Sequence, residues 1–216
     1  MGTFIFLWLQ NQHFYKTLQQ KALDAIPTTS SQERWADIGC STGLITRLAE
    51  KKGYQVTGYD PSTFSLLVAK LLSFGKAQID HKKENLFNIN ETFIIISATS
   101  LLSVVEDEKK ALAKLISLLK TKESTLVIIE PTEEMSIQNV QTHISNLKSW
   151  WYYKGLLLWA KAREGKAVDV EVFNDLEDLE ITHHYHLHDM VRVSYLKKDV
   201  MKKLNVPSNL PLSHPY

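Results

Sequence analysis

Two acidic residues and two glycines stand at positions that suit a ligand carrying a ribose. Gly39 and Gly43 lie in a short turn between an apolar run and a helical pattern. Such a turn leaves backbone N–H groups unpaired and lets a ligand approach the backbone closely. Asp37 precedes the turn, and Asp60 follows the next apolar run, 23 residues further on. A carboxylate at the second position can accept hydrogen bonds from both ribose hydroxyls, so the pair predicts a site for a nucleotide-like ligand.

The spacing of the glycines bears on which ligand this is. A dinucleotide site asks for glycine at positions 39, 41 and 44, and the sequence has Gly39, Ser41 and Leu44. The third glycine permits close packing of strand and helix under a pyrophosphate, whereas Leu44 would hold the helix away. A cofactor without a pyrophosphate is favoured, and a nicotinamide-dependent oxidoreductase stays as the weaker alternative.

Histidines near the carboxyl terminus raise the question of a metal. His184, His186 and His188 alternate and would share a strand face, beside His183. Imidazole binds zinc or nickel, but no cysteine or paired carboxylate completes a ligand set. We expect no metal, and we interpret the cluster as solvated or half-buried strand histidines, with a general base among them as the alternative.

These residues need a sheet to position them. Between Arg34 and Pro131, short apolar runs alternate with helical periods, which predicts βα units and a mostly parallel sheet with its centre at residues 92–97. The predicted strands are residues 35–38, 55–59, 78–83, 92–97 and 125–129, and the predicted helices are 13–26, 44–52, 61–75, 106–120 and 134–164.

One predicted helix has a particularly regular pattern. After Pro61, apolar residues recur at i, i+3, i+4, i+7 and i+8, which predicts one apolar face directed at the core. The residues of this face are Phe64, Leu67, Val68, Leu71 and Leu72.

Residues 134–164 are helical in pattern and unusually aromatic, with a predicted break at Lys154-Gly155. A helical segment over the carboxyl edge of the sheet would form a lid over an apolar or aromatic substrate; a plain aromatic core is the alternative. The aromatic residues are Trp150, Trp151, Tyr152, Tyr153 and Trp159.

The whole pattern predicts a Rossmann-like α/β fold with helices on both faces of a twisted sheet. Residues 179–187 and 191–196 alternate around a turn and predict a closing antiparallel hairpin. We expect a single domain: an N-terminal helical segment (1–30), a cofactor-binding core (31–131), a helical lid or insertion (132–170), the hairpin (171–200) and a loosely ordered tail (201–216).

Composition narrows the class of protein. The chain has 216 residues, 44% of them apolar and 23% charged, with a net charge of +1, values typical of a soluble globular protein. Dispersed charge gives no field that would attract nucleic acid. The one cysteine, Cys40, suits a cytoplasmic location, and the apolar run at residues 4–9 is too short to span a membrane.

The run Asp37-x-Gly39-x-Ser41-x-Gly43, followed by Asp60, resembles the first motif of class I S-adenosylmethionine-dependent methyltransferases. That motif is an acidic residue followed by alternating glycines, so Ser41 departs from it, which affects how closely the cofactor can pass. The resemblance covers roughly residues 34–131, and the final hairpin looks like the reversed last strand pair of the family.

The resemblance implies that S-adenosylmethionine is the cofactor. Residues 39–43 would pass under its methionine part, Asp37 would orient the amino group, and Asp60 would hold the ribose. The loop after the third strand would contact adenine, at Asn85 or, alternatively, Asp80. The full implied set is Asp37, Gly39, Cys40, Ser41, Gly43, Asp60, Pro61, Asn85, Leu86, Ser97 and Ala98.

The function that this implies is methyl transfer to a small molecule, with an apolar or aromatic part as the working hypothesis. In-line placement matters most in this displacement, so no catalytic residue is assigned. Tyr15 is a candidate to cap the methionine end. The tetrapeptide after the fourth strand, which begins at Ser97, lacks the Asn-Pro-Pro-Tyr type of signature, which speaks against a nucleobase acceptor. A non-catalytic Rossmann-like partner subunit is the alternative from another class.

Overall fold

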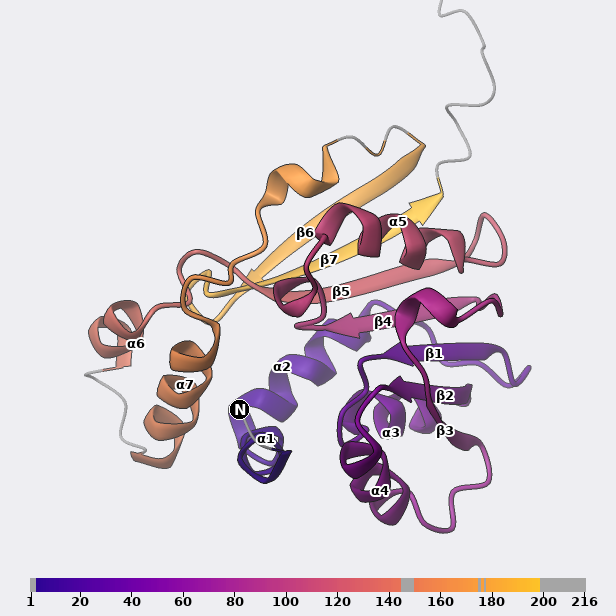
Figure 1. The fold of residues 1–216 in the computed structure, drawn as a ribbon, viewed down its shortest axis with the longest axis horizontal. Coiled ribbons are helices and arrows are strands. Elements are labelled where there is room, and N and C mark those ends of the chain that lie inside the picture. Colours follow the sequence, from indigo (N-terminus) through magenta and orange to yellow (C-terminus); the bar gives the residue numbers. More distant parts are fainter. Residues whose placement is uncertain (1–2, 145–149, 175, 177, 199–216) are drawn as a thin grey trace, which may run out of the picture.

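The protein, described from a computed structural model, is built around one seven-stranded sheet (Figure 1). The structure describes residues 3–144, 150–174, 176 and 178–198. The strands lie in the order β3-β2-β1-β4-β5-β7-β6, which confirms the predicted mostly parallel sheet with β4 at its centre. Their bounds are β1 Arg34–Ile38, β2 Gln55–Asp60, β3 Ile79–Lys83, β4 Ile95–Thr99, β5 Thr125–Pro131, β6 Leu179–His186 and β7 Val191–Lys198.

The register brings the strand ends that matter to one edge. Ile38 at the end of β1 lies opposite Tyr59 of β2 and Ala98 of β4. The chain order reverses between β1 and β4, and a ligand in an open α/β sheet binds in the crevice at such a switch point, outside the carboxyl ends of the strands. β7 runs antiparallel to β5, and the predicted closing hairpin of β6 and β7 is confirmed.

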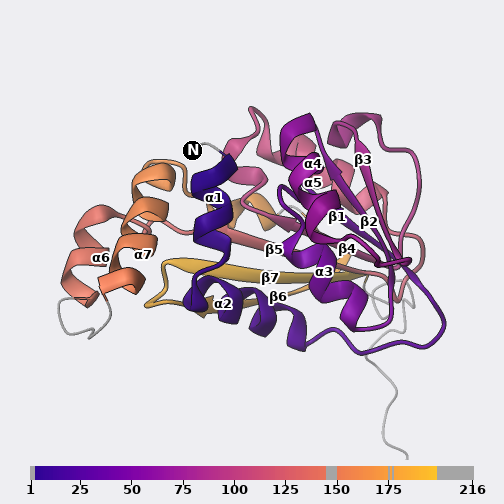
Figure 2. The same ribbon diagram turned by 90° about the horizontal axis from the view of Figure 1, so that it is seen from below.

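Helices cover the sheet on both faces, and the strands alternate between two apolar cores. Trp35 of β1 joins a core formed with α2 and α3, and Ala36 joins a second core with α5 on the opposite face (Figure 2). The helices are α1 Thr3–Gln10, α2 His13–Asp24, α3 Leu44–Lys51, α4 Thr63–Leu72, α5 Glu108–Ser117, α6 Ile137–Ile144 and α7 Trp150–Arg163, and the short 3₁₀ helices are η1 Leu86–Asn88, η2 Leu102–Val104 and η3 Val170–Phe173.

Helix α4 buries a different face from the one predicted. The predicted inward face is largely exposed, and the buried residues of the helix are Ser65, Leu66 and Ala69. Small residues face inward because the loop before α3 is close there: a Cβ on Gly43 would lie 3.4 Å from the Ala69 side chain. The residues of the predicted face that are exposed instead are Phe64, Leu67, Leu71 and Leu72.

Helix α7 also departs from the sequence pattern, because it continues through Lys154-Gly155 without the predicted break. A Cβ on Gly155 would come within 2.9 Å of the Phe14 ring, so this glycine permits α7 to approach α2 closely. In Figure 1, α6 and α7 lie together at one end of the molecule, beyond the sheet. The side chains of residues 150–153, which belong to the predicted aromatic lid, and the predicted tail at 201–216 fall outside what is described.

No helix in the described ranges is both long and apolar enough to cross a membrane.

Candidate functional site

The loop that follows β1 adopts a backbone shape that few residue types tolerate. Three of its residues have left-handed backbone angles, Gly39 at φ +71°, Ser41 at φ +50° and Gly43 at φ +73°. Glycine adopts this region without strain, whereas a residue with a Cβ does so at a cost. The N–H groups of Gly39 and Cys40 both donate to the carbonyl of Tyr59, at 2.8 and 3.0 Å. The 39–43 loop is therefore fixed to the neighbouring strand β2.

Asp60, at the end of β2, is bonded directly to this loop. Its Oδ2 accepts from the N–H of Ser41 at 2.9 Å, and its Oδ1 accepts from the N–H of Ser62 at 2.8 Å. Each carboxylate oxygen has a further lone pair, so both can still accept from a ligand. Burial raises the pKa of Asp60, and the two backbone hydrogen bonds oppose this rise. The carboxylate is thus held at the edge of the sheet, next to the backbone of the loop.

Asp37 connects three elements beneath the same loop. Its Oδ2 accepts from the N–H and hydroxyl of Thr46 on α3, at 3.0 and 2.7 Å, and its Oδ1 accepts from the Ser97 hydroxyl on β4 at 3.1 Å. Ser97 Oγ in turn accepts from the indole N–H of Trp35 at 2.8 Å. Burial raises the pKa of Asp37 to about 6 in spite of these hydrogen bonds. Most of the bonding capacity of Asp37 is therefore used in joining β1, α3 and β4.

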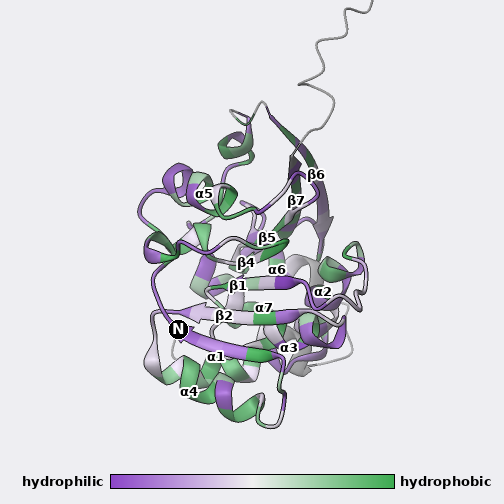
Figure 3. Cartoon of the chain, turned by 90° about the vertical axis from the view of Figure 1, so that its right-hand side faces the viewer, coloured by the Kyte–Doolittle hydropathy of each residue, from purple (hydrophilic) through white to green (hydrophobic). Residues whose placement is uncertain are grey.

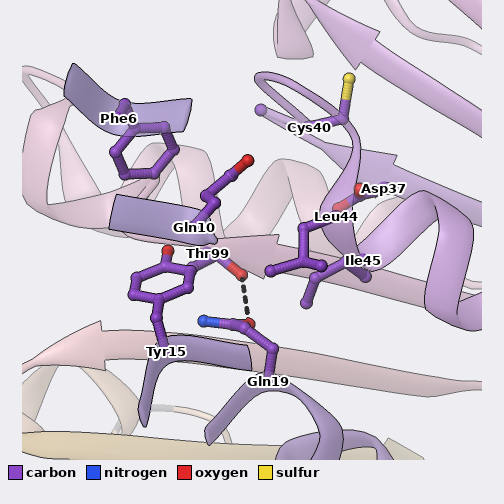
Figure 4. A pocket seen from close by; sticks show the side chains of 10 residues that line it. Phe6, Gln10, Tyr15, Gln19, Asp37, Cys40, Leu44, Ile45 and Thr99 are labelled. Atoms are coloured by element: carbon purple, nitrogen blue, oxygen red, sulfur yellow. Dashed lines mark hydrogen bonds between the residues drawn. The ribbon is translucent and has the colours of Figure 1, made fainter. Parts of the chain in front are cut away.

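A pocket opens where the loop meets the two N-terminal helices (Figure 4). Its empty space is about 280 Å³, including the part open to solvent. Figure 4 shows the Tyr15 hydroxyl and the Gln19 amide on the opposite side of the pocket from the 39–43 loop, with Gln10 between them. The lining residues are Phe6, Gln10, Tyr15, Gln19, Asp37, Gly39, Cys40, Leu44, Ile45 and Thr99.

Four of the ten residues that line the pocket come from α1 and α2, outside the predicted glycine motif. Asp37, Gly39 and Cys40 were expected there, and Tyr15 was a candidate. The polar side chains of α1 and α2 have no motif around them, so sequence reasoning missed Gln10 and Gln19. Gln10 Oε1 accepts from the Thr42 hydroxyl, which ties α1 to the loop. The Gln19 Nε2 group is buried and has no hydrogen-bond partner within the described ranges.

Cys40 lines the pocket mainly with its backbone side. Its side chain is 5% exposed, and a Cβ on Gly58 would come within 2.9 Å of the Cys40 Sγ. Figure 4 shows the sulfur pointing away from Tyr15 and Gln19. Burial raises the pKa of the thiol well above its ordinary value, with Asp37 and Asp60 adding to the rise. Cys40 is accordingly a protonated packing residue against β2.

The remaining predicted positions are spread along the sheet edge. Pro61 is exposed beside Asp60. Asn85 precedes η1, and its Oδ1 accepts from the N–H of Phe87. It lies close to Asp60, because the carbonyl of Asp60 accepts from the N–H of the neighbouring Glu84 at 3.3 Å. Leu86 and Ala98 are buried in the α5-side core, and Ser97 is bonded to Asp37. The structure therefore brings Ser97 into the Asp37 network, and it gives Leu86 and Ala98 apolar packing.

A second group of buried polar residues lies beyond the ends of β4 and β5. Glu130 at the end of β5 is 1% exposed, and burial raises its pKa to about 7, while hydrogen bonds from the N–H groups of Leu102 and Ser103 oppose the rise. Arg163 of α7 is close enough to lower this pKa and that of Tyr15. Burial nevertheless keeps the pKa of Tyr15 well above its ordinary value, so its phenol stays protonated.

The ring of Tyr15 packs edge-on against Trp159 of α7, with ring centroids 5.0 Å apart. The indole N–H of Trp159 is buried without a hydrogen-bond partner in the described ranges, as is the Nε of Arg163. Donors that are buried and unpaired are costly, and a bound ligand or ordered water normally satisfies them. The face between α2 and α7 is therefore equipped to donate hydrogen bonds.

The histidines of the closing hairpin point to packing. His183 Nδ1 bonds with Ser194 Oγ at 2.8 Å, and the ring of His184 packs edge-on against Tyr195. Burial lowers the pKa values of His183 and His186. Across the part of the chain that is described, no three His, Cys, Asp or Glu side chains are grouped so as to hold a metal ion.

The sheet order, the glycine loop after β1 and the acidic residue after β2 define the class of Rossmann-like α/β proteins with a reversed closing strand pair. A family model described as a methyltransferase domain matches residues 7–166, well over half of the 216 residues. The chain belongs to this methyltransferase family, and the predicted resemblance is confirmed. No match was found among curated proteins.

Several methyltransferases are among the solved structures that are similar to this chain. The plantazolicin methyltransferase BpumL in complex with SAH has a TM-score of 0.65 and 14% identity, covering 90% of this chain and 89% of that one. The N-methyltransferase NodS from Bradyrhizobium japonicum WM9, in complex with S-adenosyl-L-homocysteine, has a TM-score of 0.61 and 14% identity, covering 88% and 90%. A TehB-like SAM-dependent methyltransferase from Corynebacterium glutamicum has a TM-score of 0.52 and 16% identity, covering 84% and 87%. At these identities the likeness establishes the fold.

Proposed function

We propose that this protein is an S-adenosylmethionine-dependent methyltransferase that acts on a small molecule. The observation that carries the proposal is the Asp60 carboxylate, bonded at 2.9 Å to the backbone of a loop with left-handed glycines at the carboxyl edge of the sheet. Family membership and neighbours that bind S-adenosylhomocysteine support it. When bound, the cofactor would supply an electrophilic methyl group on a sulfonium.

The residues present fit this cofactor. Gly39 and Gly43 offer backbone without a Cβ along its methionine part, and the free lone pairs of Asp60 suit the two ribose hydroxyls. The unpaired Gln19 Nε2 lies across the pocket and can donate to a carboxylate such as that of the methionine part. Leu44 is buried and lines the pocket, so a side chain stands where a dinucleotide site has its third glycine, which disfavours a dinucleotide.

Asn85 is a better candidate than Asp80 for the adenine contact. Asp80 pairs with Thr57, three residues before Asp60, which at about 3.3 Å per residue lies roughly 10 Å back from the carboxyl edge. Asn85 follows the strand end and stands next to Asp60 through the neighbouring Glu84. We place adenine against the loop that contains Asn85 and Leu86.

Gln10 must turn away for the cofactor to enter. Its side chain lies across the pocket, where its Oε1 accepts from the Thr42 hydroxyl, and so occupies space that a ligand would need. Rotation of this one side chain would widen the pocket between Gly39 and Tyr15, both of which line it. The N-terminal helices then form its outer wall.

The acceptor would lie between α2 and α7. The rings of Tyr15 and Trp159 pack against each other there and are 1% and 0% exposed, so α2 and α7 would have to separate to admit an acceptor. The indole N–H of Trp159 and the Nε of Arg163 are unpaired donors within the described ranges. This combination suits an acceptor with an apolar or aromatic part and a hydrogen-bond acceptor group. Because the Tyr15 phenol stays protonated, it can orient a ligand as a donor but cannot act as the base.

Titration calorimetry with S-adenosylhomocysteine tests the proposal. The wild-type chain should bind, and Asp60→Ala should weaken binding about ten-fold or more, because a charge-assisted hydrogen bond contributes about 1.5–3 kcal/mol. Asp24→Ala, which removes an exposed carboxylate at the end of α2, is the matched control and should bind as wild type does. Failure of the wild-type chain to bind, or binding of a nicotinamide dinucleotide in its place, would refute the proposal.

A methyl-transfer assay on the same protein sample distinguishes an enzyme from a non-catalytic partner subunit. Incubation with methyl-labelled donor and a metabolite extract should transfer label to a small molecule while light scattering reports the mass of the active species. Transfer by the chain on its own excludes a purely structural role. Cofactor binding with no transfer to any extract component favours the non-catalytic partner subunit.

A further inference from the structure

The outer face of α4 is apolar along its whole length. A helix packed on a sheet normally shows polar residues to solvent, yet the exposed side chains here recur at i, i+3, i+7 and i+10. Their exposed fractions are 45% for Phe64, 64% for Leu67, 74% for Leu71 and 92% for Phe74, which follows the end of the helix. Scattered exposed leucines are ordinary, but a continuous stripe of this kind marks an interaction surface.

Helix α1 extends the stripe. The ring of Phe4, itself 70% exposed, packs edge-on against Phe64 with centroids 5.3 Å apart. Phe4, Phe64, Leu67, Leu71 and Phe74 together form what we call the α1–α4 patch. Figure 3 shows the green of apolar residues along α4, with α1 next to it. Because a single aromatic side chain can bury about 150–250 Å², the patch is on the order of several hundred Å².

The charged residues of α4 and of the segment that follows it, up to residue 79, are all lysines. The sequence has no Asp or Glu between Asp60 and Asp80, but it has Lys70 and Lys76 there, and residues 1–15 contain no Asp, Glu, Lys or Arg. Lys70 is exposed and stands at i+3 from Leu67, on the border of the stripe. Lys76 is bonded to Glu50 at 2.6 Å. An apolar face with the exposed Lys70 on its border and no carboxylate on its own helix complements an anionic lipid surface.

This charge pattern speaks against a second copy of the chain as the occupant. A two-fold interface places the same patch on both subunits, so Lys70 and its symmetry mate would come together with no carboxylate of α4 to pair with either. A lipid surface has no such conflict, because the alkyl stem of Lys70 can follow the apolar layer while its ammonium group reaches the headgroups.

We propose that the α1–α4 patch docks this protein on an anionic lipid surface, with Phe74, Leu71 and Phe4 entering the boundary between headgroups and acyl chains and Lys70 meeting the headgroups. Phe6 of α1 lines the candidate cofactor pocket, so docking places one wall of that pocket at the surface. The attachment is peripheral and needs no membrane-spanning helix. It does not depend on which acceptor is methylated.

Vesicle flotation without any methyl donor tests the docking separately from the enzymatic proposal. The full chain should float with vesicles of phosphatidylcholine and phosphatidylserine, and less with phosphatidylcholine alone. Leu71→Ser combined with Phe74→Ser should reduce binding about ten-fold or more, because burying one such side chain is worth a factor of ten or more. Since both are exposed, the double variant should unfold at the same urea concentration as wild type.

Two controls make the outcome decisive. Phe87→Ser removes a phenylalanine that is 41% exposed on η1, near Lys110 of α5 and outside the patch, and it should float as wild type does. Lys70→Glu should abolish the preference for anionic vesicles and keep the weaker binding to phosphatidylcholine.

The proposal is overturned if the wild-type chain stays with the soluble fraction on anionic vesicles, or if the double variant floats as well as wild type. A dimer in light scattering that the double variant disperses would assign the patch to a second copy and would also overturn it.

Discussion

Glu130→Gln should change how stability depends on pH, because Glu130 is ionised inside the protein at neutral pH only at a cost. Burial raises its pKa from the ordinary 4.5 to about 7. At about 1.4 kcal/mol per pH unit, the difference corresponds to about 3 kcal/mol. Between pH 4.5 and about 7 the folded chain holds a proton that the unfolded chain has released. The free energy of unfolding contributed by Glu130 therefore falls as pH rises through this window, and the loss is complete above about pH 7.

Glutamine removes the titration and keeps the main contact. Its amide oxygen can accept from the N–H of Leu102, as Glu130 Oε1 does at 2.7 Å. Near pH 5, where Glu130 is protonated, variant and wild type should be about equally stable. Near pH 8.5 the variant should be more stable by about 3 kcal/mol, and Asp37, whose pKa is also raised, contributes equally to both proteins and cancels.

Urea unfolding followed by circular dichroism at about pH 5, 7 and 8.5 measures this difference. Glu106→Gln, at an exposed glutamate, is the matched control and should show no comparable dependence on pH. An equal stability difference between Glu130→Gln and wild type at all three pH values would show that Glu130 is not held in a desolvated site, and the reasoning would be wrong.

Substitutions at Gly43 and Thr46 address the loop and its support, and Gly75→Ala is the control. Gly43→Ala and Gly75→Ala should each cost about 1–2 kcal/mol of stability, because both glycines have left-handed φ values, of +73° and +80°. Only Gly43→Ala, whose Cβ would lie 3.2 Å from His81 Nε2, should also weaken S-adenosylhomocysteine binding in calorimetry; equal binding by both variants would contradict the site. Thr46→Val removes the 2.7 Å hydrogen bond from the Thr46 hydroxyl to Asp37. In urea unfolding, the variant should be less stable than wild type by about 1.5–3 kcal/mol near pH 8, where Asp37 is ionised, and by less near pH 5. A loss of stability that does not depend on pH would contradict this role of Asp37.

Much of the sheet was predictable because its central strands β1, β4 and β5 are buried on both faces and appear in the sequence as short apolar runs. The strand from Thr125 and the turn after Ile38 follow from composition and spacing alone. Helix α4 was not predictable in the same way, since apolar residues occupy nearly its whole circumference and periodicity selects the largest ones. The inward face is set by space instead, because Ala69 must fit beside Gly43.

The candidate site was predictable where it depends on backbone and not where it depends on distant helices. Gly39 and Asp60 are visible in the sequence because few residue types can replace them. Gln10 and Gln19 enter the pocket only through the way α1 and α2 pack across the sheet edge, and a glutamine on an amphipathic helix carries no signal of its own.

The two aspartates that looked alike in the sequence have different structural roles. Asp37 accepts three hydrogen bonds from Thr46 and Ser97, so its carboxylate is a joint between β1, α3 and β4. Asp60 accepts one backbone hydrogen bond on each oxygen and keeps lone pairs for a ligand. Because the loop between them is bonded to both β2 and Asp60, a change at Asp37 should act on the cofactor through the position of the loop, whereas a change at Asp60 should act through direct contact. The spacing between Asp37 and Asp60 thus serves the fold, by holding the 39–43 loop in place, and the position of this loop in turn forms the ligand site.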